Sequence, residues 1–185
     1  MVNVMHKRYV TPNSITPQGI KDVRSRLEMT QKEFAEFIGV SKPTVERWEM
    51  GSKDISGPVC LLNQILMLHP ELSEELSLPP KKLPLRLYYY YRDTLCTIID
   101  VDEMKRIVRI KNYARNLMFR AFGINESPSF EDYEEFIESR CFPRTRDKMK
   151  IMLDSLGIPF YDPIMIIEKT NGRMAEDDFW LKIER

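Results

Sequence analysis

The stretch that decides the fold is Thr30–Gly51, with the sequence TQKEFAEFIGVSKPTVERWEMG. It begins with T-Q-K-E, a capping box in which the Thr30 hydroxyl accepts from the backbone of Glu33 and the Glu33 side chain returns a bond to the backbone of Thr30. We therefore expect a helix that begins at Gln31. Its apolar residues fall on one face of about two turns: Phe34, Ala35 and Ile38.

A second helix is expected directly after the first. Gly39 is suited to end the first helix, because glycine adopts a positive φ without a Cβ clash. Ser41 is a candidate N-cap, and Pro43 fits the first turn, where its missing N–H has no partner to lose. The pattern thus predicts a turn of about four residues and a helix over about Lys42–Glu49.

The second helix is expected to expose a small, polar and basic row. With Val45 and Trp48 facing inward at a spacing of three, the outward residues are Lys42, Pro43, Thr44 and Arg47. A helix, a turn and a second helix with an outward polar row is the geometry by which the second helix enters the major groove of DNA. Arg47 is the best candidate for reading a base, since a guanidinium can bond guanine bidentately.

The whole run Thr30–Gly51 resembles the helix-turn-helix of lambda-type (XRE) repressors. Residues 15–76 are similar to the DNA-binding domain of the MqsA and HigA antitoxins, over about a third of the chain. The motifs that carry the resemblance are I-T-P, L-x-M-T-Q-K-E, S-K-P-T-V-E-R-W-E-x-G and L-x-x-H-P-E-L. The resemblance implies a five-helix lambda-repressor-like domain and a dimer that binds a palindromic operator in double-stranded DNA, as an autoregulating antitoxin does.

Four residues near the ends of these helices are candidate phosphate contacts. The resemblance implies that Gln31, at a helix N-terminus, and Lys53 hold phosphates. Ser41 would contact the DNA backbone beside its capping role. Ser52 lies in the exit loop with Lys53, where backbone N–H groups can hold a phosphate, although a solvated loop is the alternative.

Charge and cysteine content restrict the function classes. Lys plus Arg and Asp plus Glu are both 28, so the formal net charge is zero and no overall basic field attracts nucleic acid. Residues 1–60 carry nine basic and seven acidic residues, so DNA affinity would depend on the placement of a few charges and on a dimer. The three cysteines are far apart, and no two of them form a C-x-x-C pair. We therefore expect no zinc site and no disulfides, and a cytoplasmic protein without a cofactor.

The chain divides by composition into four parts. We expect a flexible arm at 1–15, the helix-turn-helix domain at 16–77, a proline-rich linker at 78–84 with the sequence LPPKKLP, and an α+β partner-binding domain at 85–185. In the arm, Lys7 and Arg8 could contact DNA or belong to a solvated tail. No apolar run approaches the length of a membrane span.

The last domain is expected to contain a three-stranded antiparallel meander followed by helices. The strands are residues 85–91, 94–101 and 106–113, and the helices are 129–140, 145–156 and 164–170. Tyr88 and Tyr90 lie on the opposite face from Tyr89 and Tyr91. One tyrosine face must pack on helices, and the other is an amphipathic aromatic surface of the kind enriched at protein interfaces.

Motifs for catalysis are absent from the pattern, so we predict that the chain is not an enzyme. Cys141 is followed by Arg146 after four residues instead of the five of a phosphatase loop, and the glycines of such a loop are missing. The three acids at 176–178 lack the alternating spacing of a cation loop and fit a solvated turn, or a partner for Arg146 and Arg173.

Two function hypotheses remain. The first is a DNA-binding repressor that acts as the antitoxin of a two-gene locus. The second is a protein inhibitor, similar to phage-borne anti-CRISPR proteins, whose residues 85–185 bind a toxin or a defence enzyme while the helix-turn-helix controls expression. Candidate partner contacts in that domain are Tyr88, Tyr90, Arg144, Arg146 and Arg173. Whether the domain co-purifies with the product of a neighbouring gene would discriminate the two.

Overall fold

The computed structural model describes residues 9–185, so Lys7 and Arg8 of the expected arm lie outside the described residues. The chain is a mixture of helices and antiparallel sheet, as expected for the α+β class. Its internal contacts divide it into two compact units, Met1–Ser77 and Leu78–Arg185. Among the described residues, no helix combines the length and the apolar character needed to cross a bilayer.

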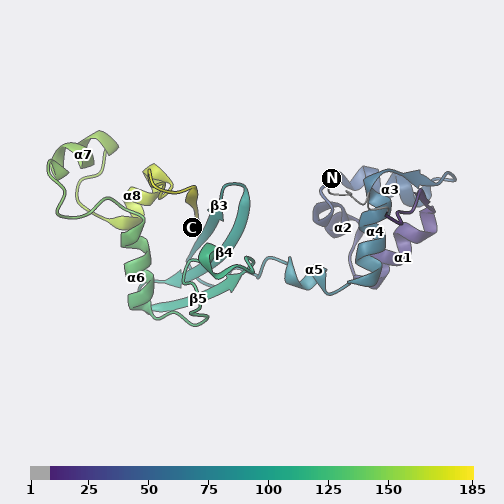
Figure 1. Cartoon of the computed structure of the whole chain (residues 1–185), viewed down its shortest axis with the longest axis horizontal. Helices are drawn as coiled ribbons and strands as arrows, with labels where there is room; N and C mark the ends of the chain where they lie inside the picture. The colour runs from purple at the N-terminus through teal and green to yellow at the C-terminus, as the bar shows by residue number, and fades with distance from the viewer. Residues whose placement is uncertain (1–8) are drawn as a thin grey trace, which may run out of the picture. The chain divides into compact units, whose positions relative to one another are not determined.

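The first unit is built from helices with two short strands. The helices are α1 (Pro17–Arg26), α2 (Gln31–Phe37), α3 (Lys42–Met50), α4 (Pro58–Leu68) and α5 (Leu72–Glu75). Figure 1 shows α1 to α4 gathered into one bundle. Strand β1 (Ser14–Ile15) pairs with β2 (Ile55–Ser56), so the last two residues of the expected flexible arm are held in place by backbone pairing.

Local capping signals define where the first helices begin. The Thr16 hydroxyl accepts from the backbone N–H of Gly19, and Pro17 occupies the first turn of α1. The capping box at the start of α2 forms as predicted, with Thr30 and Glu33 bonded reciprocally at 3.2 and 2.8 Å. The bundle closes on a small apolar core: Ile20, Val23, Phe34, Ala35, Val45 and Leu66 are buried.

The second unit is a four-stranded antiparallel sheet with helices on one face. The strands are β3 (Leu85–Tyr91), β4 (Thr94–Asp102), β5 (Ile107–Asn112) and β6 (Phe179–Glu184), in the order β5-β4-β3-β6. The predicted meander is present, but β6 was missed. Its neighbour β3 lies almost ninety residues earlier, so only tertiary pairing defines it, for example Tyr88 opposite Lys182.

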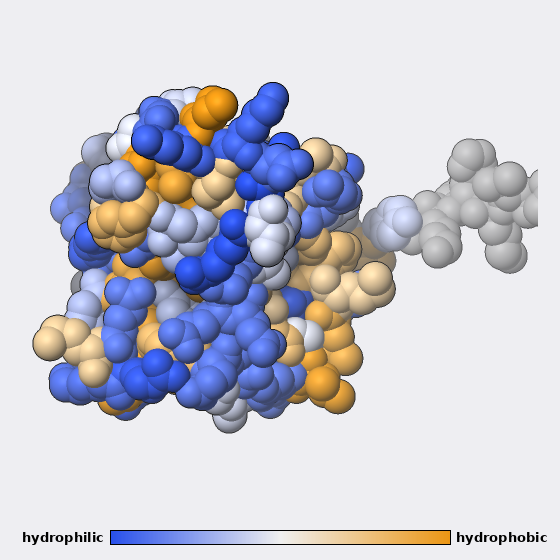
Figure 2. All heavy atoms as spheres, turned by 90° about the vertical axis from the view of Figure 1, so that its left-hand side faces the viewer, coloured by the Kyte–Doolittle hydropathy of each residue, from blue (hydrophilic) through white to orange (hydrophobic). Residues whose placement is uncertain are grey.

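The helices of this unit are η1 (Leu117–Phe119), α6 (Phe130–Ser139), α7 (Met149–Leu156) and α8 (Pro163–Thr170). Figure 1 shows α6 against the sheet. The prediction that α7 begins near residue 145 is wrong, because Lys148 is left-handed with a φ of 62° and the helix begins after it. Polar side chains cover most of the end of this unit seen in Figure 2, with hydrophobic ones exposed between them.

The tyrosines of β3 divide between two faces, as predicted. Tyr89 is buried and meets Phe136 of α6 edge-on at 5.2 Å, and Tyr91 stacks on Phe119 on the same face. On the other face, Arg86 makes a buried bidentate ion pair with Asp100 at 2.6 and 2.7 Å. The face away from the helices thus contains a buried ion pair, whereas the face toward the helices is packed by aromatic side chains.

Part of the predicted linker packs on this second face of the sheet. The Pro79 carbonyl accepts from Arg86 Nη1 at 2.8 Å, and Lys81 pairs with Glu184 at 3.7 Å. Pro79, Pro80, Lys82 and Leu83 also line a cavity with Ile98. Ile98 is 1% exposed although it lies on the side away from the helices. The proline-rich segment is therefore bound to the second unit over these residues.

Candidate nucleic-acid interface

The turn between α2 and α3 is closed by backbone hydrogen bonds. Gly39 has a φ of 73°, and its N–H donates to the Glu36 carbonyl at 3.3 Å. The N–H of Val40 donates to the Ala35 carbonyl at 2.9 Å. These are the two bonds of a Schellman motif, which satisfies the last carbonyls of a helix and requires a left-handed residue at this position. Gly39 thus fixes the angle at which the chain enters α3.

The start of α3 differs from the prediction in one detail. Ser41 occupies the N-cap position, but its side chain makes no capping bond to the backbone. Its hydroxyl instead lies 2.9 Å from the hydroxyl of Thr44, one turn further along. The Ser41 carbonyl accepts from the N–H groups of Thr44 and Val45, so the helix is initiated by the backbone. Ser41 remains exposed, beside the predicted base-contacting row.

The predicted base-contacting residues lie on the solvent side of α3. Lys42, Pro43 and Arg47 are exposed, and Thr44 is half-buried. Lys42 Nζ forms an ion pair with Glu46 at 2.8 Å, one turn away on the same helix. Arg47 makes no ion pair with any residue that the structure describes. Its guanidinium is therefore available to an external acceptor.

The exit loop after α3 presents two of the predicted phosphate contacts. Ser52 and Lys53 are exposed and, among the described residues, neither makes a side-chain hydrogen bond or ion pair. They follow Gly51, which is extended and ends α3. The loop thus places a hydroxyl, an ammonium and backbone N–H groups just beyond the exposed helix.

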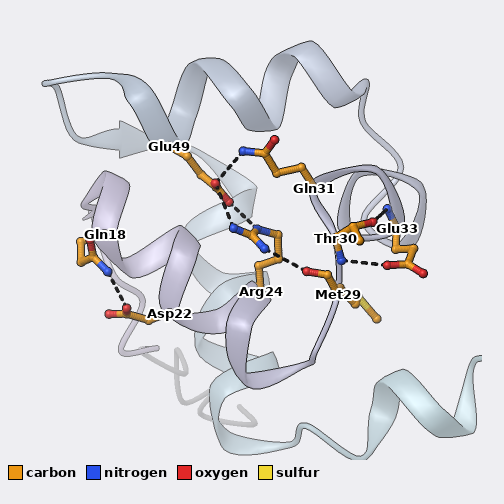
Figure 3. Close-up of polar contacts among 8 residues, drawn as sticks. All are labelled: Gln18, Asp22, Arg24, Met29, Thr30, Gln31, Glu33 and Glu49. Atoms are coloured by element: carbon orange, nitrogen blue, oxygen red, sulfur yellow. Dashed lines mark hydrogen bonds and ion pairs between the residues drawn. The ribbon is translucent and has the colours of Figure 1, made fainter.

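The inner side of α3 is anchored by a buried carboxylate that the sequence reading did not identify (Figure 3). Glu49 is 4% exposed and accepts from Arg24 at 2.6 and 3.2 Å. Arg24 also donates to the Met29 carbonyl at 2.9 Å. These bonds connect α1, the loop before α2, and α3, and so set the position of the exposed helix relative to the bundle.

Gln31 belongs to the same network. Its side-chain amide donates to Glu49 Oε2 at 2.8 Å (Figure 3). The structure therefore gives the predicted phosphate contact a partner inside the protein, and Gln31 would have to leave Glu49 to donate this group to DNA. Gln31 is held there because the Glu49 carboxylate is buried and charged, and such a group forms strong hydrogen bonds with nearby donors.

The electrostatics of Glu49 favour its charged form. Burial by itself would raise the pKa of the Glu49 carboxyl. Hydrogen bonds from Arg24 and Gln31, together with the positive charge of Arg24, outweigh burial, so this pKa lies below its ordinary value. The network is thus a charged one at neutral pH.

The apolar anchors of α3 are only partly as expected. Val45 is fully buried, whereas Trp48 is half-buried at the edge of the core. The deepest position near the end of α3 belongs to Glu49 instead. Nothing in the local pattern distinguishes this glutamate from an exposed one, since its partner Arg24 lies 25 residues earlier on another helix.

The candidate partner residues of the second unit fall into separate groups. Tyr90 stacks on Trp180 of β6 at 4.5 Å, and Arg173 lies over the same indole at 5.3 Å. Tyr88 donates to Glu184 at 2.5 Å, with Lys182 over its ring. The structure thus joins Tyr90 and Arg173 through Trp180, which the sequence reading expected to be buried and did not include among the contacts.

The arginines of the loop after α6 point to different sites. Arg144 pairs with Glu138 at 2.6 Å and lies 4.6 Å from the ring centroid of Tyr161. Arg146 instead lines a cavity with Arg173. Two of the acids at 176–178 have other partners than the predicted arginines, because Asp177 pairs with Arg140 and Asp178 with Arg92.

The cysteine chemistry of this loop is inert. Burial raises the pKa of the Cys141 thiol to about 12, and its sulfur lies 3.4 Å from the Ile137 carbonyl. A thiol with this pKa is protonated at neutral pH and is a poor nucleophile. All three cysteines are free and buried. Within residues 9–185, no cluster of three or more His, Cys, Asp and Glu side chains is arranged to hold a metal ion.

The geometry of α2, the closed turn and α3 defines a helix-turn-helix unit with an exposed second helix. Residues 2–77 match the model of a family described as the antitoxin component of a bacterial toxin-antitoxin system, MqsA. This match marks residues 2–77 as an MqsA-like antitoxin segment. A comparison with curated proteins finds no match to this chain. The family match ends at residue 77, where the first unit also ends.

Proposed function

We propose that this protein is a sequence-specific DNA-binding repressor, the autoregulating antitoxin of a toxin-antitoxin locus. The observation that carries the proposal is Arg47, which is exposed on α3 and makes no ion pair with any of residues 9–185, on a helix held from behind by Glu49. The antitoxin family matched by residues 2–77 supports the same assignment. In this proposal, the helices of the first unit act as a lambda-repressor-like domain, and α3 is the recognition helix.

Base reading is assigned to the exposed row of α3. Arg47 would bond a guanine bidentately, while Lys42, Pro43 and Thr44 would contact neighbouring base edges. Lys42 would exchange its ion pair with Glu46 for a contact to DNA. Ser41, Ser52 and Lys53 would hold the phosphate backbone on either side of the groove, with Gln31 contributing only if it is released from Glu49.

A homodimer on a palindromic operator fits the surface of α4. Leu61, Ile65 and Leu68 are 43%, 38% and 67% exposed and recur at spacings of four and three, on one side of the helix. An apolar row of this kind is suited to pack against a second copy. A dimer would also double the phosphate contacts, which the small charge surplus of residues 1–60 requires.

The direct test is the binding of the full-length chain to a labelled duplex from upstream of its own gene, measured by fluorescence anisotropy. Arg47→Ala should weaken specific binding by about 1–3 kcal/mol and relax preference at one base position. Arg26→Ala is the matched control, because Arg26 is an exposed arginine at the end of α1 and outside the proposed interface. Equal affinities of the wild-type and Arg47→Ala proteins would refute the assignment of α3.

The phosphate assignment has a separate signature in salt dependence. Lys53→Ala should weaken binding to specific and scrambled duplexes alike and reduce the slope of log K against log salt by about 1. Ser52→Ala should weaken both without changing the slope, since it removes no charge. A loss confined to the specific duplex would place Lys53 at a base.

A protein partner is proposed for the second unit, which the family match does not reach. The side of the sheet away from the helices carries the half-buried Tyr88 and Tyr90, and Arg144 is exposed on the loop after α6. These residues offer aromatic and cationic contacts of the kind enriched at interfaces. Purification of the tagged chain co-expressed with the product of the adjacent gene would test it. Capture of that product together with relief of its toxicity would support an antitoxin, whereas inhibition of a defence enzyme would favour the inhibitor hypothesis.

A further inference from the structure

Two motif-like segments of the second unit meet in the folded chain. Arg140–Arg146 has the sequence RCFPRTR, and residues 172–180 have the sequence GRMAEDDFW. The buried Arg140 guanidinium joins them, donating to the Gly172 carbonyl at 2.8 and 3.0 Å and to the Asp177 carboxylate at 2.7 and 3.0 Å. The helix-turn-helix function uses neither segment, yet the fold holds the two together.

Where these segments meet, they enclose a cavity of about 370 Å³ with the end of α8. The volume falls within the range of small-molecule sites. Its apolar wall includes Phe142, Ile166, Met174 and Ala175. Arg146 and Arg173 line it from the two segments, and Glu176 adds an acidic residue to the lining. The cavity therefore combines an apolar wall with cationic groups from opposite segments.

The charge in this cavity is not balanced internally. Asp177 neutralises Arg140, and hydrogen bonding to this arginine holds the pKa of the Asp177 carboxyl below its ordinary value. In contrast, Arg146 and Arg173 make no ion pair with any carboxylate among residues 9–185. Glu176 offsets one of these two charges, so the lining retains a net positive charge.

We propose that this cavity binds a small organic anion that joins an apolar group to a carboxylate or a phosphate monoester. The anionic group would lie between the guanidinium groups of Arg146 and Arg173, which can bond two oxygens at once. The apolar group would lie against Phe142 and Met174. The site serves binding rather than covalent chemistry, because the Cys141 thiol in the cavity wall is protonated and bonded to backbone carbonyls.

Trp180 is a built-in reporter of this site. Its indole lies under Arg173 at 5.3 Å, and the only other tryptophan of the chain is Trp48 in the first unit. In a full-length Trp48→Phe protein, phenyl phosphate should change the Trp180 fluorescence saturably. Its dissociation constant should lie about tenfold or more below that of inorganic phosphate, because a buried phenyl ring adds hydrophobic stabilisation. Phenol should bind more weakly than phenyl phosphate.

Variants of the two arginines test the geometry, with calorimetry as a second readout that does not depend on the indole. Arg146→Ala and Arg173→Ala should each weaken phenyl phosphate binding about tenfold or more, the effect of losing one charge-assisted bond. Arg144→Ala is the matched control, since this arginine is on the same loop but pairs with Glu138. Arg146 is exposed, so its replacement leaves the fold intact, and an unchanged melting temperature would verify this.

Three outcomes would overturn the proposal. These are unchanged binding in both Arg146→Ala and Arg173→Ala, an equal loss in Arg144→Ala, and equal affinities for phenyl phosphate and inorganic phosphate. The last would mean that the arginines attract any anion without using the apolar wall. DNA binding by α3 is measured separately, so a negative result here leaves the proposed function of the first unit untouched.

Discussion

Arg24 in the first unit and Arg140 in the second both hold distant segments together, but they support different kinds of site. Arg24 binds Glu49 and so fixes a helix whose exposed residues already share one face by their spacing. Arg140 joins a loop at 140–146 to another at 172–180, and the candidate contacts come from both. A site on one helix is thus readable from local sequence, whereas a site made by two loops exists only after folding.

The largest effect should come from breaking the second network. Arg140→Met removes the donor to Asp177 and to the carbonyls of Gly172 and Phe179, and should destabilise the second unit by about 3–5 kcal/mol, the usual result of removing one partner of a buried pair. Urea unfolding followed by Trp180 fluorescence in the Trp48→Phe background measures this. Arg144→Met is the control. An equal loss of stability in this variant would show that the buried contacts of Arg140 do not account for the effect.

The first network should be somewhat less sensitive, because Arg24 is 20% exposed. Glu49→Gln leaves Arg24 without its carboxylate and should destabilise the first unit by about 2–4 kcal/mol. Trp48 fluorescence in a Trp180→Phe background follows this unit alone. Glu46→Gln lies three residues earlier on the same helix, at a half-buried carboxylate that pairs only with the exposed Lys42 among the described residues, and should have little effect. A comparable loss there would argue against the buried pair.

Lowering the pH should destabilise the first unit through Glu49. The pKa of Glu49 in the folded chain lies below its ordinary value of 4.5, so its contribution is complete above about pH 4.5 and is lost as the pH falls through the folded value. Thermal melts of the first unit between pH 5 and pH 2 should therefore show a steeper loss for the wild type than for Glu49→Gln. Parallel curves would mean that Glu49 does not carry this dependence.

The smallest effect is expected on the exposed side of α3. Glu46→Ala removes the ion pair with Lys42 and should change the stability of the first unit by less than about 0.5 kcal/mol, as for other exposed pairs one turn apart. DNA affinity should rise, because a carboxylate beside the phosphates is lost and Lys42 is released. A fall in affinity would indicate that Glu46 itself contacts a base.

Much of the first unit could be predicted because its signals are local. The Thr30 and Glu33 capping box, Gly39 at the end of α2 and the exposed row of α3 all depend on residues within one or two turns of each other. Helix caps and helical spacing are physical constraints that act over four residues or fewer. Errors in this unit fall where a longer-range partner intervened, as for Gln31 and its bond to Glu49.

The second unit could be predicted only in part, for the same reason. Strands β3, β4 and β5 follow one another through short turns and were found by their β-rich composition. Strand β6 pairs with β3 almost ninety residues earlier, for example Phe179 opposite Tyr91, so no short turn links the two strands. The start of α7 depended on the left-handed Lys148, which has no sequence signature.

The sequence by itself determined the helix-turn-helix, its closed turn and the exposed positions of Lys42 and Arg47, since propensity and spacing act within the helix. Only the tertiary structure decided that Glu49 is buried and charged, that Gln31 is engaged, and that Arg146 and Arg173 face one cavity. These depend on desolvation and on which donors come within bonding distance. Such conditions arise only when distant segments pack together.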